Sequence, residues 1–168
     1  MNQAFPSPKS NNKDSLIGTI GAALGMSITW LVSDYFLDGS APILVLSMGA
    51  SAVILFTMPK APTAQPVPVI LSHVVAAFFG VVSAQIFDNI PLALSVAVGV
   101  HAGVMTRFGY MHPPSGGTAL SAVIGGSAVT NLGFSFIWQP VLINAVLLVA
   151  VAIIVNAPFS WRRYPVRG

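Results

Sequence analysis

The sequence contains no cysteine and no glutamate, and charged residues make up only 7% of its 168 positions. Without cysteine the chain has no disulfide, no thiolate metal ligand and no cysteine nucleophile. Soluble domains carry roughly a quarter charged residues, so this chain has too few to cover a water-exposed surface. Its seven basic and four acidic residues are scattered and form no basic patch. We therefore expect no nucleic-acid partner.

Apolar residues supply 55% of the chain, which predicts an all-α membrane protein. A helix needs roughly 20 apolar residues to cross about 30 Å of hydrocarbon. Six segments meet or approach this length, although 115–131 is only weakly hydrophobic. These predicted spans are 16–37, 41–58, 69–87, 91–108, 115–131 and 137–156. We therefore expect about six transmembrane helices.

The charges predict the orientation of these helices. With the N-terminus in the cytoplasm, six helices place every basic residue on the cytoplasmic side, as the positive-inside rule requires. The domain organisation is then a polar cytoplasmic tail (1–14), a transmembrane domain (15–158) and a basic cytoplasmic tail (159–168). Four helices would also leave both termini inside. Trp161 and Tyr164 are predicted to anchor the last helix at the interface.

Two similar pairs of segments indicate an internal repeat. "SMGASAV" (47–53) resembles "SGGTALSAV" (115–123), and "QPVPVILSHVV" (65–75) resembles "QPVLINAVLLV" (139–149). Three helices before and three after would be oppositely oriented, which is a recurrent architecture of transporters with interrupted helices near the midplane. Small residues four apart, as in "GAALG" (21–25) and "GVHAG" (99–103), favour close helix packing and homo-oligomers.

The stretch "MHPPSGGTALSA" (111–122) is the most polar run inside the apolar region. Pro113 and Pro114 suit an entry to a helix, with Ser115 as its N-cap. Gly116, Gly117 and Thr118 would then offer unpaired N–H groups, and a helix N-terminus favours anions. His112 would supply a titratable hydrogen-bond donor. This motif therefore predicts a small-anion site.

Other residues are predicted to complete that site. Arg107 would draw anions to the mouth, and Gly49, Ala50 and Ser51 would form a narrow opposite wall. An equally weighted alternative is that the HPPSGG stretch only breaks and caps a helix at the membrane surface.

The motif His112-Pro113-Pro114, followed by Ser115 to Leu120, resembles the signature of the HPP family of integral membrane proteins. The run 49–53, then Pro62, 64–66 and His73, is similar to the family's other motif. The resemblance implies transport, with nitrite passage assigned to plastid and cyanobacterial members. The family is commonly described as four-spanning.

The sequence departs from the family pattern at two places. Val67 and Pro68 stand where a basic residue and asparagine often follow Gln-Pro, which removes an anion-attracting charge. Ser115 and Gly117 stand where small alanines are usual.

Ionisable and amide side chains within the apolar segments are further candidates for the pathway. His73 and His101 are intramembrane histidines, which indicate function by default, although each can also simply bond a neighbouring helix. Gln65 and Asn144 are predicted to line the path or hold helices together, and Asn156 to hold helices together. No carboxylate lies near either histidine, so we expect no metal and no cofactor.

These observations predict a transporter or channel for a small inorganic anion, most plausibly nitrite, in a bacterial plasma (inner) membrane. No Ser–His–acid set, carboxylate pair or phosphate loop is present, so an enzyme is not expected. Two alternatives are a membrane assembly or regulatory subunit and a histidine-ligated membrane redox protein.

Overall fold

The computed structural model describes residues 11–37 and 41–166, and within these ranges the chain is helical without a strand. The all-α part of the prediction is thereby confirmed. Short 3-10 turns connect several of the helices. The α-helices are α1 (Asn12–Leu37), α2 (Ala41–Thr57), α3 (Pro66–Ile86), α4 (Ile90–Phe108), α5 (Gly116–Ile124), α6 (Ser127–Thr130) and α7 (Ile143–Asn156).

Four helical stretches of the described residues are long and apolar enough to cross a membrane: Asn12–Phe36, Pro66–Ile86, Ile90–Phe108 and Ile137–Asn156. With 17 residues, α2 lies at the lower limit for a span.

The predicted span 115–131 is not one helix. It consists of α5, with nine residues, and α6, with four. Gly126 separates them with φ at +71°, a left-handed conformation that glycine adopts without strain and that ends a helix. Neither six full-length spans nor a repeat of three plus three helices is confirmed.

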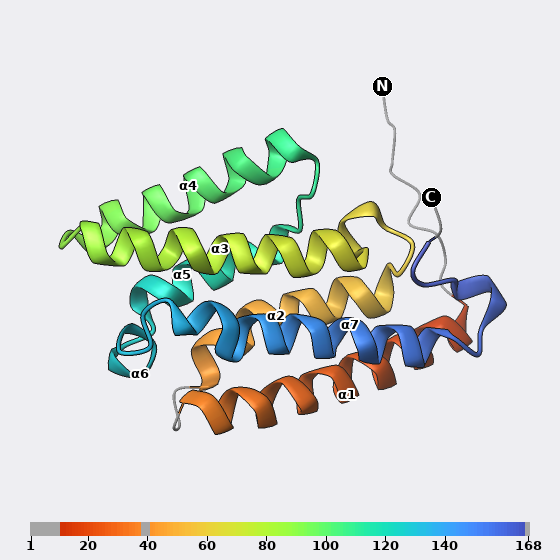
Figure 1. The fold of residues 1–168 in the computed structure, drawn as a ribbon. Coiled ribbons are helices and arrows are strands. Elements are labelled where there is room, and N and C mark those ends of the chain that lie inside the picture. The colour runs from red at the N-terminus through yellow and green to blue at the C-terminus, as the bar shows by residue number, and fades with distance from the viewer. Residues whose placement is uncertain (1–10, 38–40, 167–168) are drawn as a thin grey trace.

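The helices pack both against their neighbours in sequence and against helices distant in sequence (Figure 1). α1 contacts α2 and α7, while α3 contacts α4 and α5, and α2 contacts α5 between the two groups. α1 and α3 begin, and α2, α4 and α7 end, at one end of the bundle (Figure 1). The basic residues of the described chain lie in or near these helix ends: Lys13, Lys60, Arg107, Arg162 and Arg163. One end of the molecule is therefore basic.

Glycines set the closest helix contacts. A Cβ on Gly21 or Gly25 would collide with the ring of Phe56, so α1 and α2 meet only because these positions lack side chains. A Cβ on Gly80 would lie 2.6 Å from that of Ala122, which places α3 directly against α5. Gly99 has no heavy atom within 4 Å and does not pack inside the chain.

The segment after α7 folds back onto the bundle through Arg162, which is 4% exposed. Its guanidinium donates to Asp14 Oδ1 at 3.0 Å, to the Phe56 carbonyl at 2.5 Å and to Asn156 Oδ1 at 2.8 Å. Asn156 thus connects the C-terminal segment to the end of α7, and among the described residues its own side chain makes no hydrogen bond to a second α-helix. Tyr164 is 7% exposed, so the prediction that it anchors the chain at the membrane interface is wrong.

Candidate functional site

The segment after α4 turns into the bundle. Gly109 ends α4 with φ at +74°, and Pro113–Ser115 forms a 3-10 turn that leads into α5. Ser115 Oγ lies 2.8 Å from the hydroxyl of Ser72. Ser72 is six residues inside α3, which corresponds to about 9 Å along the helix axis. α5 therefore begins inside the protein and not at the end of the bundle.

The structure differs from the predicted helix start at Ser115 and Gly116. Pro113 and Pro114 have no N–H to offer. The Ser115 N–H donates to the His112 carbonyl at 3.0 Å, and the Gly116 N–H donates back to Pro113 and Pro114. Ser115 has helical φ and ψ and makes no side-chain cap, so it is not the N-cap that the sequence predicted. The N–H groups of Ser115 and Gly116 are thus not free to bind an anion.

The side chains supply a different arrangement, centred on His112. Its ring is fully buried, and Nδ1 lies 2.6 Å from the carbonyl oxygen of Thr63 in the connection between α2 and α3. Its Nε2 lies 2.8 Å from Ser51 Oγ on α2. The motif residue therefore links two segments that are more than 45 positions away in the sequence.

His73 on α3 shares the same serine. Its Nε2 lies 2.8 Å from Ser51 Oγ, and its Nδ1 lies 2.7 Å from Thr118 Oγ1 on α5. Thr118 in turn contacts Ser47 Oγ at 2.7 Å. The imidazole centroids of His73 and His112 are 5.2 Å apart.

A second branch joins α3, α4 and α5. The hydroxyl of Ser115 lies 2.9 Å from His101 Nε2 and donates to the His112 carbonyl at 2.7 Å. Ser72 lies 3.3 Å from His101 Nε2. We refer to both branches together as the histidine–hydroxyl cluster, which consists of Ser47, Ser51, Ser72, His73, His101, His112, Ser115 and Thr118.

The cluster is polar but carries no fixed charge. All eight side chains are at most 3% exposed. Among the described residues, no Asp, Lys or Arg side chain hydrogen-bonds to it. Burial lowers the pKa of His112 to about 4, although the hydrogen bond to the Thr63 carbonyl opposes this shift. His112 is therefore neutral at pH 7 unless an anion stabilises its cation.

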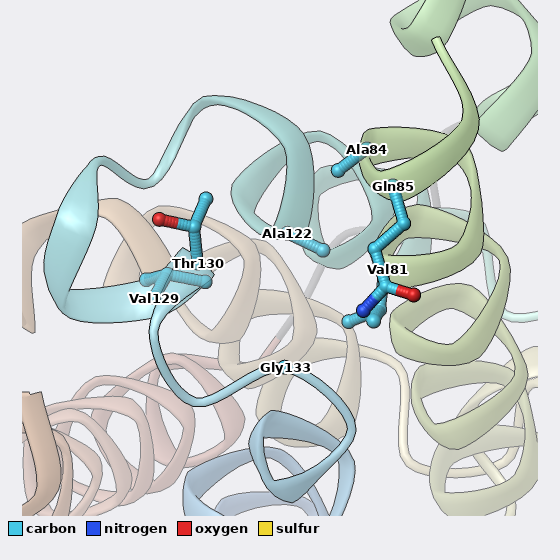
Figure 2. A pocket seen from close by; sticks show the side chains of 7 residues that line it. All are labelled: Val81, Ala84, Gln85, Ala122, Val129, Thr130 and Gly133. Carbon is cyan, nitrogen blue, oxygen red and sulfur yellow. The ribbon is translucent and has the colours of Figure 1, made fainter.

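A small cavity of about 60 Å³ lies beyond the cluster, with Gln85 and Thr130 on opposite sides (Figure 2). Ala122 lines it one helical turn beyond Thr118. Met48, Ala77 and Val81 pack with Ala122 into one apolar cluster. About one helical turn of apolar side chains thus separates the cavity from the histidine–hydroxyl cluster.

Comparison with known proteins identifies the group to which this arrangement belongs. The family model of the HPP transmembrane region matches residues 7–165, which is nearly the whole chain. The chain belongs to the HPP family. The resemblance drawn from the two sequence motifs is thereby confirmed.

Two transmembrane proteins of Dictyostelium discoideum are similar to the chain. One is 37% identical over 133 residues, which are 77% of this chain and 46% of the relative. The other is 35% identical over 126 residues, which are 71% of this chain and 40% of the relative. The chain thus spans less than half the length of these curated relatives. No solved structure matches it.

The structure brings together only part of the predicted site. His112, Ser115 and Thr118 of the HPP motif lie in the cluster, with Ser51, His73 and His101. Pro113 and Pro114 begin the 3-10 turn that leads into α5. Gly116 has no neighbour where a Cβ would stand, whereas Gly117 lies against Ser47. Gly49 faces Met26 on α1, and Ala50 is exposed.

Three predicted pathway residues lie outside the cluster. Arg107 is exposed at the end of α4. Gln65 donates to the carbonyls of Pro59 and Ala61 and accepts from the Val166 N–H, so it holds the α2–α3 connection against the C-terminal segment. Asn144 donates to Ser33 Oγ at 2.7 Å and joins α7 to α1.

Sequence reasoning missed Ser47, Ser72 and Thr63. Ser47 lies four residues before Ser51, the spacing that puts two side chains on one face of a helix. Ser72 directly precedes His73, and this proximity to a predicted pathway residue could have identified it from the sequence. Thr63 acts through its backbone carbonyl, and no side-chain pattern identifies such a contact.

Proposed function

We propose that this HPP-family chain moves a small inorganic anion across the membrane past the histidine–hydroxyl cluster, with nitrite as the first candidate. The observation that carries the proposal is the cluster itself. Buried polar groups inside a membrane protein are costly, and intramembrane ionisable residues commonly mark solute pathways. Here three histidines and five hydroxyls converge where the named motif enters the bundle.

The chemistry of the cluster suits an anion of low charge. Hydroxyl and imidazole groups donate hydrogen bonds to an anion, and a protonated imidazole adds charge when the anion is present. A fixed lysine or arginine would be expensive to bury. A carboxylate would repel it.

Nitrite is favoured by the family resemblance, since nitrite passage is assigned to plastid and cyanobacterial members. We further propose that the basic end of the bundle faces the cytoplasm of a bacterial cell, with both termini on that side. Homo-oligomers remain a prediction, supported by the unpacked face of α4 that carries Gly99 and Gly103.

The test is a flux assay with the purified chain in lipid vesicles, comparing nitrite, nitrate, formate and chloride. Thr118→Val removes a cluster hydroxyl while keeping the side-chain shape, and should reduce nitrite flux by about tenfold or more, as expected when a buried polar partner is lost. Thr130→Val is the matched control, because Thr130 is exposed and bonds only within its own turn. Nitrite uptake no faster than in protein-free vesicles would contradict the proposal.

The two alternatives predict different results. An assembly or regulatory subunit would show no flux with any of the four anions. A redox protein would show a visible absorption band from a bound cofactor. The redox alternative has less support, because both ring nitrogens of His73 and of His112 already have hydroxyl or carbonyl partners.

A further inference from the structure

We propose that the hydroxyls and imidazoles from Ser47 to His112 form a polarised proton relay, so that a proton travels with each anion. This inference rests on the proposed transport function. It follows from counting the hydrogens that each atom of the chain can donate.

The Thr63 carbonyl fixes the polarity at one end. A carbonyl oxygen only accepts, so the His112 Nδ1 that lies 2.6 Å away must carry a hydrogen. In neutral His112 the other ring nitrogen is then an acceptor. Ser51 Oγ lies 2.8 Å from that Nε2 and 3.2 Å from the Ser47 carbonyl, which is also an acceptor. Nε2 is the nearer acceptor and takes the hydroxyl hydrogen, because otherwise two acceptor atoms 2.8 Å apart would face each other with no hydrogen between them.

The remaining bonds follow from this assignment. Ser51 has donated its hydrogen, so it accepts from Nε2 of His73. Neutral His73 then accepts at Nδ1, and Thr118 donates to it. Thr118 has no second hydrogen, so Ser47 donates to Thr118. Each hydrogen bond from Ser47 to Thr63 therefore has one donor, and in each the donor lies on the Ser47 side and the acceptor on the Thr63 side.

This order permits a balanced proton transfer. A proton from water or from the acid form of the solute binds Ser47 Oγ, and Ser47 passes its own hydrogen to Thr118. Thr118 passes its hydrogen to His73 Nδ1, His73 passes the Nε2 hydrogen to Ser51, and Ser51 passes its hydrogen to His112 Nε2. The net result is one proton taken up at Ser47 and one imidazolium at His112.

The reversed chain is equally well bonded. His112 then donates from both ring nitrogens, and each hydroxyl donates one step back towards Ser47. Ser47 has no acceptor left in the chain, but the Pro114 carbonyl lies 3.1 Å from its hydroxyl and accepts the last hydrogen. The cluster therefore satisfies both the neutral and the protonated state.

His112 is the end of the relay, because the Thr63 carbonyl keeps Nδ1 protonated in both states. The proton therefore leaves by the same steps in reverse. His112 Nε2 returns its hydrogen to Ser51, each group passes one hydrogen back, and Ser47 gives a proton to the departing anion, which leaves as the neutral acid. Ser47 lies one helical turn from Ser51, on the side where α2 begins. The described titratable groups that face His112 are His73, whose ring contacts it, and His101, reached through Ser115. Without a fixed charge nearby, an entering anion is the available partner for the imidazolium.

The experiment measures nitrite accumulation in vesicles of the full chain under an imposed potential, with uptake by protein-free vesicles subtracted. One net charge crossing the membrane changes accumulation by about 50-fold per 100 mV. An anion that travels with a proton carries no net charge, so its accumulation should not respond to the potential. A pH dye inside the vesicles should report acidification together with nitrite uptake.

Three variants identify the relay. Ser51→Ala removes the hydroxyl between the two imidazoles, and the nitrite flux that remains should follow the potential. Ser51→Thr should restore the response of the unmodified chain. Ser83→Ala is the matched control: it deletes a buried α3 hydroxyl that donates to the Ala93 carbonyl, outside the relay.

The outcomes separate the relay from the transport function. No protein-dependent nitrite uptake at any potential would overturn both. Nitrite uptake that follows the potential in the unmodified chain, or remains insensitive to it in Ser51→Ala, would overturn the relay alone. Nitrogen-15 spectra of labelled histidine give a check without transport. Neutral His112 should carry its hydrogen on Nδ1 and neutral His73 on Nε2, and the opposite tautomer for either would overturn the relay.

Discussion

His112 and Ser51 meet at 2.8 Å although 61 residues separate them in the chain. This contact requires the connection between α4 and α5 to enter the bundle, because Ser51 lies well inside α2. The entry brings the backbone of the HPP motif away from water, where its polar groups need internal partners. Prolines reduce that requirement because they have no N–H. The motif residues are thus suited to a buried connection between helices.

The two glycines of the motif have different surroundings, which gives a matched pair of variants. A Cβ on Gly117 would lie 3.1 Å from the Cβ of Ser47, whereas a Cβ on Gly116 would meet nothing within 4 Å. Gly117→Val should push α5 from α2, stretch the Ser47–Thr118 hydrogen bond, and reduce nitrite flux by about tenfold or more. Gly116→Val should leave the flux within about twofold, since no atom lies where its side chain would begin. Equal flux in the two variants would contradict a role for this contact.

Transport should depend on pH through His112. Without an anion its pKa is about 4, and a bound anion raises it because the anion favours the cation. Proton uptake and anion binding therefore strengthen each other. We expect nitrite flux, corrected for protein-free vesicles, to rise as pH falls from 7 to 5, most steeply near 5.

His112→Gln should flatten this pH dependence while keeping a hydrogen-bond donor. The position of His73 within the relay predicts a comparable effect for His73→Gln. A full pH slope in His112→Gln would rule out protonation of this side chain as the cause.

The all-helical class and most of the long helices could be predicted, because the mean hydropathy of a segment of about 20 residues identifies a possible membrane span. The apolar runs around α1, α3 and α4 were found from the sequence, and their helices follow. The division of 115–131 into α5 and α6 was not found from the sequence. It depends on the backbone conformations of Gly125 and Gly126, which the hydropathy of that segment does not reveal.

The candidate site was predicted in its residue types but not in its chemistry. The sequence indicated His112 and Thr118, but it assigned the anion to backbone N–H groups. The structure shows the Gly116 N–H bonded to the preceding turn, and places the imidazole of His73 against both Ser51 and Thr118. Such contacts join residues distant in the chain, and the spacing of residues within one helix does not specify them.

The orientation of the bundle can be tested with single cysteines, since the chain has none. Lys60 lies after α2 at the basic end, and Asp88 lies after α3 at the other. Lys60→Cys should be labelled only from the cytoplasmic side by a reagent that does not cross membranes, and Asp88→Cys only from outside. Labelling of position 60 from outside would contradict the proposed orientation.

Stability should depend on Arg162 more than on its neighbour Arg163. The Arg162 guanidinium joins α1, α2 and α7 through Asp14, Phe56 and Asn156, and it is almost fully buried. Arg162→Gln should leave a buried carbonyl and a partly buried carboxylate without this partner, at a cost of roughly 2–4 kcal/mol. The measurement is thermal unfolding in detergent at fixed pH and salt. Arg163→Gln is the control, because Arg163 is exposed and should shift stability by less than about 0.5 kcal/mol. If both variants unfold at the same temperature, Arg162 does not hold the C-terminal segment against the bundle.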